Sequence, residues 1–445
     1  EGVYLDKGLN VALGHRRLSL IDLSQTGHQP MTDKSESVVV VFNGEIYNYK
    51  ELKEKLLQFG YQFHSTSDTE VILNAYLQWG LDCFKEMNGM FAIALLDKRC
   101  NKIFLVRDYI GIKPLYYSFT KDFGLVFASE VRAFKALKAD WQENENWKKY
   151  FLLFGHLPEP ITTLEKVFSL DKGSILEVNI STLKFEKYTF NKQYFHYNIT
   201  DEKEAVLKIR ETLTNAVQRH LISDAPIGLF LSGGIDSSIL TILAKQFVGS
   251  NLKTLSIVFD DNKFSEKKYQ DIIIKKTGSQ HQSYLISQQN FYDALPDILD
   301  AMDQPSCDGI NTYFISKKSK EFGLKAVLSG LGADELFGGY NSFYRTSVLE
   351  KFKKMPSALL GVAGLFPDDK KKKISFLATK SSLGDYLFNR GFYTTKQIAE
   401  LLDCSHEEMN ELSQNASNLF PEFLDKLDSQ EKVSYLETNY YMKNQ

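Results

Sequence analysis

The sequence has few cysteines, little net charge and no long apolar run, and each absence argues against a class of protein. Four cysteines among 445 residues, without the spacing of a metal site, fit a reducing cytosol rather than a disulfide framework. The net charge of −3 gives no sign of a nucleic-acid partner. Apolar stretches such as residues 357–366 are too short to cross a bilayer. We therefore expect a cytoplasmic protein whose partners include neither nucleic acid nor a membrane.

The chain has enough apolar material for more than one folded core. Its hydrophobic content is 43%, and its length predicts at least two domains. Residues 191–200 are polar and aromatic, and a helical pattern follows from residue 201 to residue 218. We place the domain boundary between residues 190 and 203, with one domain over residues 1–195 and a second over residues 200–445.

Residues 226–238 are the most informative stretch, and they read Pro-Ile-Gly-Leu-Phe-Leu-Ser-Gly-Gly-Ile-Asp-Ser-Ser. A buried strand over residues 227–231 runs into a glycine turn, and a helical pattern follows. Such a turn points backbone N–H groups at one spot, where the helix dipole adds positive potential. The sequence therefore predicts a phosphate site. Its expected members are Ser232, Gly233, Gly234, Ser237 and Ser238.

The same turn carries an acid, Asp236, which on its own would repel phosphate. The acid makes sense if Mg²⁺ lies between the two. The turn lacks the Gly-Lys-Ser/Thr of a Walker A motif, which favours a site that holds pyrophosphate while the α-phosphate is attacked. Residues 325–340 repeat the pattern of strand, Ser-Gly turn and acid, here Asp334. We expect Asp236 and Asp334 to face one magnesium pyrophosphate at the carboxyl ends of two strands.

The pattern of helices and consecutive strands expected before residue 200 indicates an α+β layered domain. Ser67 or Asp68 is the expected N-cap of a helix that ends at Gly80. Strands are predicted at 38–42, 90–96, 102–106, 115–119 and 125–128, a turn at 44–48, and helices at 50–59 and 68–79.

Several polar residues of this region are hard to explain by packing. Arg17 borders an apolar segment, the trio Asn43, Gly44 and Glu45 follows a buried strand, and Asp68 opens a helix. Arginine pairs bidentately with an α-carboxylate, and carboxylates pair with an α-ammonium. An amide and a glycine N–H can stabilise an oxyanion. The set fits a free amino acid, although each residue taken singly also fits a surface ion pair or a cap.

With these motifs the chain resembles the glutamine-dependent asparagine synthetases. The motifs are Gly-His-Arg-Arg-Leu-Ser-Leu at 14–20, Phe-Asn-Gly-Glu-Ile-Tyr-Asn at 42–48, Arg-Asp-Tyr-Ile-Gly-Ile-Lys-Pro-Leu-Tyr-Tyr at 107–117, Ser-Gly-Gly-Ile-Asp-Ser-Ser at 232–238 and Ser-Gly-Leu-Gly-Ala-Asp-Glu-Leu-Phe-Gly-Gly-Tyr at 329–340. The resemblance covers nearly the whole chain. It implies an αββα glutaminase domain, similar to the N-terminal-nucleophile hydrolases, followed by an α/β parallel-sheet domain similar to the PP-loop ATP pyrophosphatases.

The resemblance also implies roles for single residues. Arg17 would hold the glutamine carboxylate, and Glu45 and Asp68 its amine. Asn43 and the N–H of Gly44 would form the oxyanion hole. In the second domain ATP would adenylate a carboxylate, and ammonia would then displace AMP. The residues implied for ATP and pyrophosphate are Leu231, Ser232, Gly233, Gly234, Asp236, Ser237, Ser238, Val258, Ser329 and Gly330, and those for Mg²⁺ are Asp236 and Asp334.

The chain departs from the family pattern at both of its ends. The family's N-terminal cysteine nucleophile is missing, and we expect each cysteine present to be a small buried residue rather than a nucleophile. These cysteines are Cys83, Cys100, Cys307 and Cys404. We expect a fragment that lacks the first strand and the nucleophile, and that stops after the helix at 435–441, before a lysine that assists adenylation in the family.

A third departure concerns the carboxylate acceptor. Leu331 stands where asparagine synthetases usually carry Glu or Asp, and residues 305–312 lack the arginine and hydroxyls that some of them present to aspartate. Because a leucine is neither a base nor an ammonium ligand, one expected acceptor is a different carboxylate, for example a sugar uronate used in polysaccharide synthesis. The alternative is that aspartate is still the acceptor and binds through other groups.

Two rival functions stay open at this point. One is a relative that adenylates its own substrate for ring closure and uses no glutamine, and the other is a nucleotide-binding relative without catalysis. For the preferred function we expect an apolar ammonia channel to which Met87 and Met90 contribute. The sequence leaves the oligomeric state open, a homodimer included, as well as the activity of this fragment.

Overall fold

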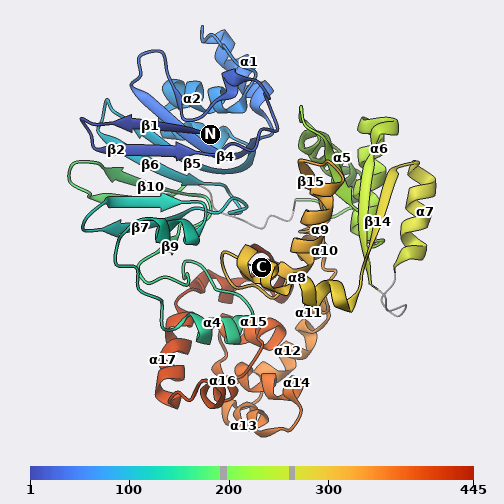
Figure 1. Ribbon diagram of the computed structural model, residues 1–445. Helices are drawn as coiled ribbons and strands as arrows, with labels where there is room; N and C mark the ends of the chain where they lie inside the picture. The colour runs from blue at the N-terminus through green and yellow to red at the C-terminus, as the bar shows by residue number, and fades with distance from the viewer. Residues whose placement is uncertain (191–197, 260–265, 445) are drawn as a thin grey trace. The chain divides into compact units, whose positions relative to one another are not determined.

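The computed structural model describes residues 1–190, 198–259 and 266–444, and the chain forms two compact units (Figure 1). Unit 1 comprises Glu1–Leu115, Leu170–Asp297 and Asn311–Gly330. Unit 2 comprises Tyr116–Ser169, Ile298–Ile310 and Leu331–Gln445. The expected domain boundary at 190–203 overlaps residues 191–197, which lie outside the described residues.

The first part of unit 1 is built on a six-stranded antiparallel sheet of order β11-β10-β6-β5-β4-β3. A separate hairpin, β1–β2, precedes it. The elements are β1 (Gly2–Asp6), β2 (Val11–His15), β3 (Met31–Thr32), β4 (Val38–Ile46), α1 (Tyr49–Gln58), α2 (Asp68–Trp79), α3 (Cys83–Glu86), β5 (Gly89–Asp97), β6 (Lys102–Arg107), β10 (Ser174–Asn179) and β11 (Phe185–Thr189).

Helices α1 and α2 cover one face of this sheet (Figure 1). Alternate residues of β4, such as Val38 and Val40, pack with Leu52 of α1 and Ile72 of α2 in one core. Ser67 caps α2 by accepting the N–H of Thr69, and Gly80 follows the last turn, as the sequence predicted.

The predicted turn at residues 44–48 is wrong in part. Strand β4 continues through Gly44 and Glu45 to Ile46, and only Tyr47 and Asn48 form the turn. The strand persists because β5 offers backbone partners as far as Gly89, which pairs with Ile46. Turn-forming residue types therefore lie inside a paired strand, and the pairing decides their conformation.

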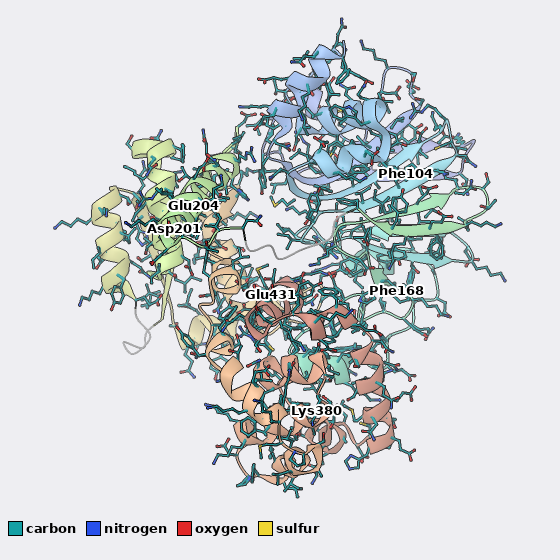
Figure 2. All side chains as sticks on the ribbon, turned by 180° about the vertical axis from the view of Figure 1, so that it is seen from behind. Phe104, Phe168, Asp201, Glu204, Lys380 and Glu431 are labelled. Carbon is teal, nitrogen blue, oxygen red and sulfur yellow. The ribbon has the colours of Figure 1, made fainter. Side chains whose placement is uncertain are left out.

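The second part of unit 1 is a parallel sheet of order β14-β13-β12-β15. Its elements are α5 (Glu202–His220), β12 (Ile227–Phe230), α6 (Ile235–Val248), β13 (Lys253–Phe259), α7 (Lys267–Thr277), β14 (Gln280–Ile286), α8 (Gln288–Ala301), α9 (Gly309–Glu321) and β15 (Ala326–Leu328). Asp201 caps α5 by accepting the N–H of Glu204, and both residues are labelled in Figure 2. An antiparallel α+β part followed by a parallel α/β part agrees with the predicted fold class.

Unit 2 combines a three-stranded sheet, of order β8-β7-β9, with a set of helices. Its largest core surrounds Tyr386, whose hydroxyl lies 2.8 Å from Nε2 of the fully buried His156. The elements are β7 (Tyr116–Thr120), β8 (Gly124–Ala128), α4 (Trp147–Phe154), β9 (Phe168–Ser169), α10 (Ala333–Phe337), α11 (Asn341–Tyr344), α12 (Thr346–Lys353), α13 (Ser357–Val362), α14 (Asp369–Lys372), α15 (Ser382–Arg390), α16 (Thr395–Leu402), α17 (His406–Ser417) and α18 (Ser429–Leu436).

The cysteines differ from the expectation. Cys83 is buried, but Cys100 and Cys307 are exposed, so the prediction that each fills a core position is wrong for these two. Both follow or flank polar residues in loops, where no apolar periodicity could have indicated burial. Among the described residues no helix is long and apolar enough to cross a membrane.

Candidate functional site

The strand order of the parallel sheet alone indicates where a ligand would bind. The chain runs from β12 outward to β13 and β14, and then returns to place β15 on the other side of β12. The direction of winding therefore reverses between β12 and β15. Ligands of open parallel sheets bind at such a reversal, beyond the carboxyl ends of the strands. Residues 231–238, here called the phosphate loop, leave β12 at this point.

The phosphate loop is held open by its own contacts. Gly233 has φ of +99°, and a Cβ there would lie 3.0 Å from the carbonyl oxygen of Glu266, so a glycine is needed. Ser238 Oγ donates to the carbonyl of Gly234 at 2.7 Å, and Ser232 Oγ lies 3.0 Å from Ser237 Oγ. The predicted hydroxyls thus fix the start of α6, whose N-terminus carries the positive end of the helix dipole.

The end of β15 lies directly against this loop. A Cβ on Gly330 would lie 3.1 Å from Cβ of Asp236 and 3.2 Å from the backbone nitrogen of Ser237. Ser329 precedes it and is exposed. Val258 lies three residues beyond Leu255, which pairs with Phe230 at the end of β12. The structure therefore places the predicted ATP and pyrophosphate residues at or near the ends of three neighbouring strands, with Gly330 in contact with the phosphate loop.

Asp334 is on α10 of unit 2, so its pairing with Asp236 of unit 1 stays a prediction. Its carboxylate lies against Gly339, where a Cβ would come within 1.8 Å of Asp334 Oδ1. No group of three or more His, Cys, Asp or Glu side chains among the described residues could hold a metal by itself. A magnesium ion at Asp236 would therefore need phosphate oxygens to complete its ligands, which fits the chemistry expected of a magnesium nucleotide.

The candidate amino-acid pocket is formed at the open edge of β4. On β5, the N–H of Phe91 donates to Asp108 Oδ2 and its carbonyl accepts the N–H of Asp108, so both groups face β6. Gly44, the partner of Phe91 on β4, is therefore in a non-hydrogen-bonded pair, and its N–H faces the opposite edge. The N–H groups of Phe42 and Ile46 share that edge, where the side chains of Gln29 and Asp68 accept them.

The geometry of β4 requires a glycine at position 44. Its φ is +152°, and a Cβ would lie 2.0 Å from the carbonyl oxygen of Met90. An N–H donor that faces away from the paired strand β5 can serve in an oxyanion hole. The placement fits the role predicted for the Gly44 N–H, and the roles of Asn43 and Gly44 in an oxyanion hole stay predictions.

Asp68 and Arg17 lie on the same side of the sheet. Asp68 is buried at the start of α2, and burial raises its pKa to about 6 although Ile46 donates to it and Arg17 attracts it. Arg17 Nη2 donates to the carbonyl of Ile21 at 2.5 Å, and its guanidinium lies against Gly27, where a Cβ would clash with it. Arg17 is close enough to Asp68 to lower its pKa, and the roles of the two charges in holding an amino acid stay predictions.

Glu45 is a buried carboxylate of the candidate pocket. Its side chain is buried, and Oε1 has no hydrogen-bond partner among the described residues. Burial, together with the negative charge of Asp68, raises the pKa of Glu45 to about 7 against the opposing effect of Lys113. A buried carboxylate with an unused oxygen is a ready acceptor for an ammonium group.

Lys113 is a pocket residue that the sequence interpretation missed. Its backbone N–H donates to Asp108 Oδ2, the oxygen that also accepts Phe91, so the lysine is fixed beside the β4–β5 pair. Asp108 accepts five backbone N–H groups in all, and Arg107 donates to three carbonyls, which makes the loop rigid. Burial lowers the pKa of Lys113, while Glu45 and Asp108 raise it. The motif at 107–117 contained the signal, but sequence order gave no reason to bring it to Glu45.

Glutamine binding should weaken as the pH falls below about 7. The pKa values of Glu45 and Asp68 are raised, so the empty folded protein holds protons that an incoming ammonium must displace. We expect the affinity to fall up to about tenfold per pH unit below pH 7, with proton release on binding. Calorimetry in two buffers of different ionisation enthalpy measures that release. The Glu45→Gln variant should lose the step near pH 7, and an unchanged profile would contradict this role.

A cavity of about 540 Å³ in unit 1 bears on the predicted ammonia channel. Met87 lines it together with Asp108 and with Arg219 of α5, the helix that leads to β12. Lys85 and Glu86 also line it, so this cavity is more polar than the apolar seam that we expected. The channel itself stays a prediction.

Two family descriptions match the chain, one for each part of it. A glutamine amidotransferase domain matches residues 1–189, and asparagine synthase matches residues 208–445. Asparagine synthetase [glutamine-hydrolyzing] 1 of Bacillus subtilis is 36% identical over 383 residues, which is 84% of this chain and 59% of that protein. A relative from Methanocaldococcus jannaschii is 34% identical over 82% of this chain and 74% of its own length. The chain thus spans less than two thirds of the Bacillus protein.

These matches define a glutamine amidotransferase domain followed by an asparagine synthase domain. The chain belongs to the asparagine synthase family. Among solved structures, a glutamine phosphoribosylpyrophosphate amidotransferase from Bacillus subtilis overlaps 59% of this chain and 65% of its own, with 14% identity and a TM-score of 0.30. That overlap is too small to support an argument.

Proposed function

We propose that the protein uses ATP to amidate a carboxylate with ammonia taken from glutamine, and that the acceptor is aspartate, giving asparagine. The observation that carries the proposal is the phosphate loop, which has two glycines, three hydroxyls and Asp236 but no lysine, at the reversal between β12 and β15. A site of this kind suits a reaction in which pyrophosphate leaves and the α-phosphate is transferred.

The proposed chemistry has two steps in the synthetase domain. An oxygen of the acceptor carboxylate attacks the α-phosphorus of ATP, the bond to the bridging oxygen breaks, and pyrophosphate leaves. Ammonia then attacks the carbonyl carbon of the acyl-adenylate, and AMP leaves with one oxygen of the acceptor. The phosphate loop would bind the pyrophosphate portion, with Gly330 and Val258 beside the AMP portion. Mg²⁺ held by Asp236 and Asp334 would neutralise the leaving charge.

The ammonia would come from the pocket on β4. Arg17 would bind the α-carboxylate of glutamine, and Glu45 and Asp68 its ammonium. Asn43 and the N–H of Gly44 would stabilise the oxyanion that forms when the side-chain amide is attacked.

A second acceptor is favoured by one observation. Leu331 is 70% exposed and follows Ser329 and Gly330 at the loop after β15. A leucine there supplies neither a base nor a partner for an amino group, whereas a sugar uronate carries no amino group that needs one.

The test supplies the protein, expressed from its complete gene, with glutamine labelled with ¹⁵N in its amide, MgATP and a panel of carboxylates that includes aspartate and a hexuronate. Mass spectrometry follows AMP, pyrophosphate and the amide. With an ¹⁸O-labelled carboxylate, one ¹⁸O should appear in AMP, which reports the acyl-adenylate. Formation of ADP and phosphate, or of no AMP with any acceptor, would overturn the proposal, and an amide from the uronate alone would select the second acceptor.

A further inference from the structure

A basic segment of unit 2, residues 351–373, has no part in the proposed reaction. Residues 351–373 contain seven lysines and two aspartates, a net charge of +5 in a chain whose total is −3. Between the lysines runs the apolar stretch 355–367, which forms α13 and a short 3-10 helix, Ala363–Leu365. Lys370, Lys371 and Lys372 lie on α14, which begins after the cap Asp368.

The apolar side chains of this segment point in two directions. Leu360 and Ala363 are buried, and Leu360 packs with Leu349 and Leu377. On the other side, four side chains at helical spacing face solvent. Their exposed fractions are 55% for Leu359, 53% for Val362, 71% for Leu365 and 43% for Phe366. Exposed apolar side chains scattered singly are ordinary, but four on one short ridge mark an interaction surface.

Lysines border the ridge on both sides. Lys351 and Lys354 precede it on and after α12, and Lys370 and Lys371 follow it on α14; none of the four has an acidic ion-pair partner among the residues that the structure describes. Asp369 forms an ion pair with Lys372 at 2.8 Å, and the carboxylate of Asp368 accepts the backbone N–H of Lys370. Figure 1 shows α13 and α14 together at the lower end of unit 2. The free charge of this face is therefore positive.

We propose that the ridge formed by Leu359, Val362, Leu365 and Phe366, with its flanking lysines, binds the surface of an anionic lipid bilayer. An exposed apolar ridge inserts at the boundary between headgroups and acyl chains, and lysines beside it bind acidic headgroups. An acidic protein groove would satisfy the lysines, but four exposed apolar side chains flanked by these lysines match both the acyl region and the acidic headgroups of a bilayer. This inference does not depend on the proposed reaction, and it is the alternative to the expectation that no membrane is a partner.

The experiment is co-sedimentation of the purified chain with phosphatidylcholine vesicles, with and without phosphatidylserine. We expect binding at least about tenfold tighter to the anionic vesicles, and weakened by salt, because each lysine near such a surface contributes about fivefold. The Phe366→Trp variant should show a blue-shifted emission with anionic vesicles only. Equal binding to both vesicle types, or to neither, would overturn the inference.

Paired variants distinguish binding through the ridge from nonspecific adsorption to vesicles. Val362→Ser with Leu365→Ser should weaken binding by about tenfold or more, because two apolar side chains no longer leave water. Lys370→Glu with Lys371→Glu should do the same through charge. The matched controls are Phe123→Ser and Lys121→Glu, which change exposed residues near the β7–β8 turn. Loss in the controls as well, or self-association through the ridge without vesicle binding, would contradict a lipid surface. Unchanged thermal unfolding shows that the variants fold.

Discussion

Replacing Asp236 by asparagine should lower the rate of ATP-dependent amide formation by about a hundredfold to a thousandfold. Asp236 lies in the first turn of α6, with Gly330 against its Cβ, so its carboxylate is presented beside the phosphate loop. Asparagine keeps the size and removes the charge that a magnesium nucleotide needs. Release of ammonia from glutamine should stay within about twofold, because that pocket is on β4. Steady-state assays of AMP and of glutamate measure both.

The control for this variant is Asp271→Asn on the exposed surface of α7, which should leave both rates unchanged. Asp334→Asn gives a sharper comparison. If Asp236 and Asp334 bind one metal ion, either variant alone should cost about as much as the two together, since groups that act as a unit are not additive. Fully additive losses would show that the two carboxylates act separately. Amide formation by Asp236→Asn within tenfold of the parent would remove Asp236 from the mechanism.

Local sequence signals predicted much of the fold because they act over a few residues. Ser67 and Gly80 bound α2, since a cap and a glycine stop depend only on backbone groups within one turn. The strand, glycine turn and helix start at 227–238 were predictable for the same reason, because they form one continuous segment, whereas phosphate binding there stays a prediction.

The parts that failed depend on distant partners. Gly44 and Glu45 have turn-forming character, yet β5 holds them in a strand, and no nearby residue announces that pairing. Lys113 reaches the pocket only because Asp108 binds both Lys113 and Phe91, a link between loop and sheet that sequence spacing does not reveal. Asp334 begins a short helix rather than a plain turn, where the chain passes into unit 2.

The candidate site shows the same division. A family resemblance predicted the residue types of the candidate amino-acid pocket, but the pKa values of these residues depend on their burial. The pKa of Glu45 is raised to about 7 because the side chain is enclosed near Asp68, and neither fact is encoded near residue 45. Charges that look like surface residues in the sequence are therefore the ones whose proton equilibria the fold changes most.

The Gly44→Ala variant should lose glutamine-dependent amide formation by at least about a hundredfold while it retains synthesis from added ammonium. The new Cβ would lie 2.0 Å from the carbonyl oxygen of Met90, and backbone atoms on both strands would have to separate. Pairing of β4 with β5 would shift at the N–H that faces the pocket, so the oxyanion donor moves even if the strand survives. The φ of +152° adds strain, and we expect the free energy of unfolding to fall by about 3 kcal/mol.

Gly14→Ala is the matched control, because Gly14 lies on β2 of the separate β1–β2 hairpin and a Cβ there meets nothing within 4 Å. It should leave thermal unfolding and both nitrogen sources unaffected. Comparing glutamine with ammonium in the same Gly44→Ala preparation separates the two effects of the substitution, since general misfolding would reduce amide formation from either source. Equal loss with both sources would mean that Gly44 serves only the fold, and full glutamine-dependent activity would remove its N–H from the oxyanion hole.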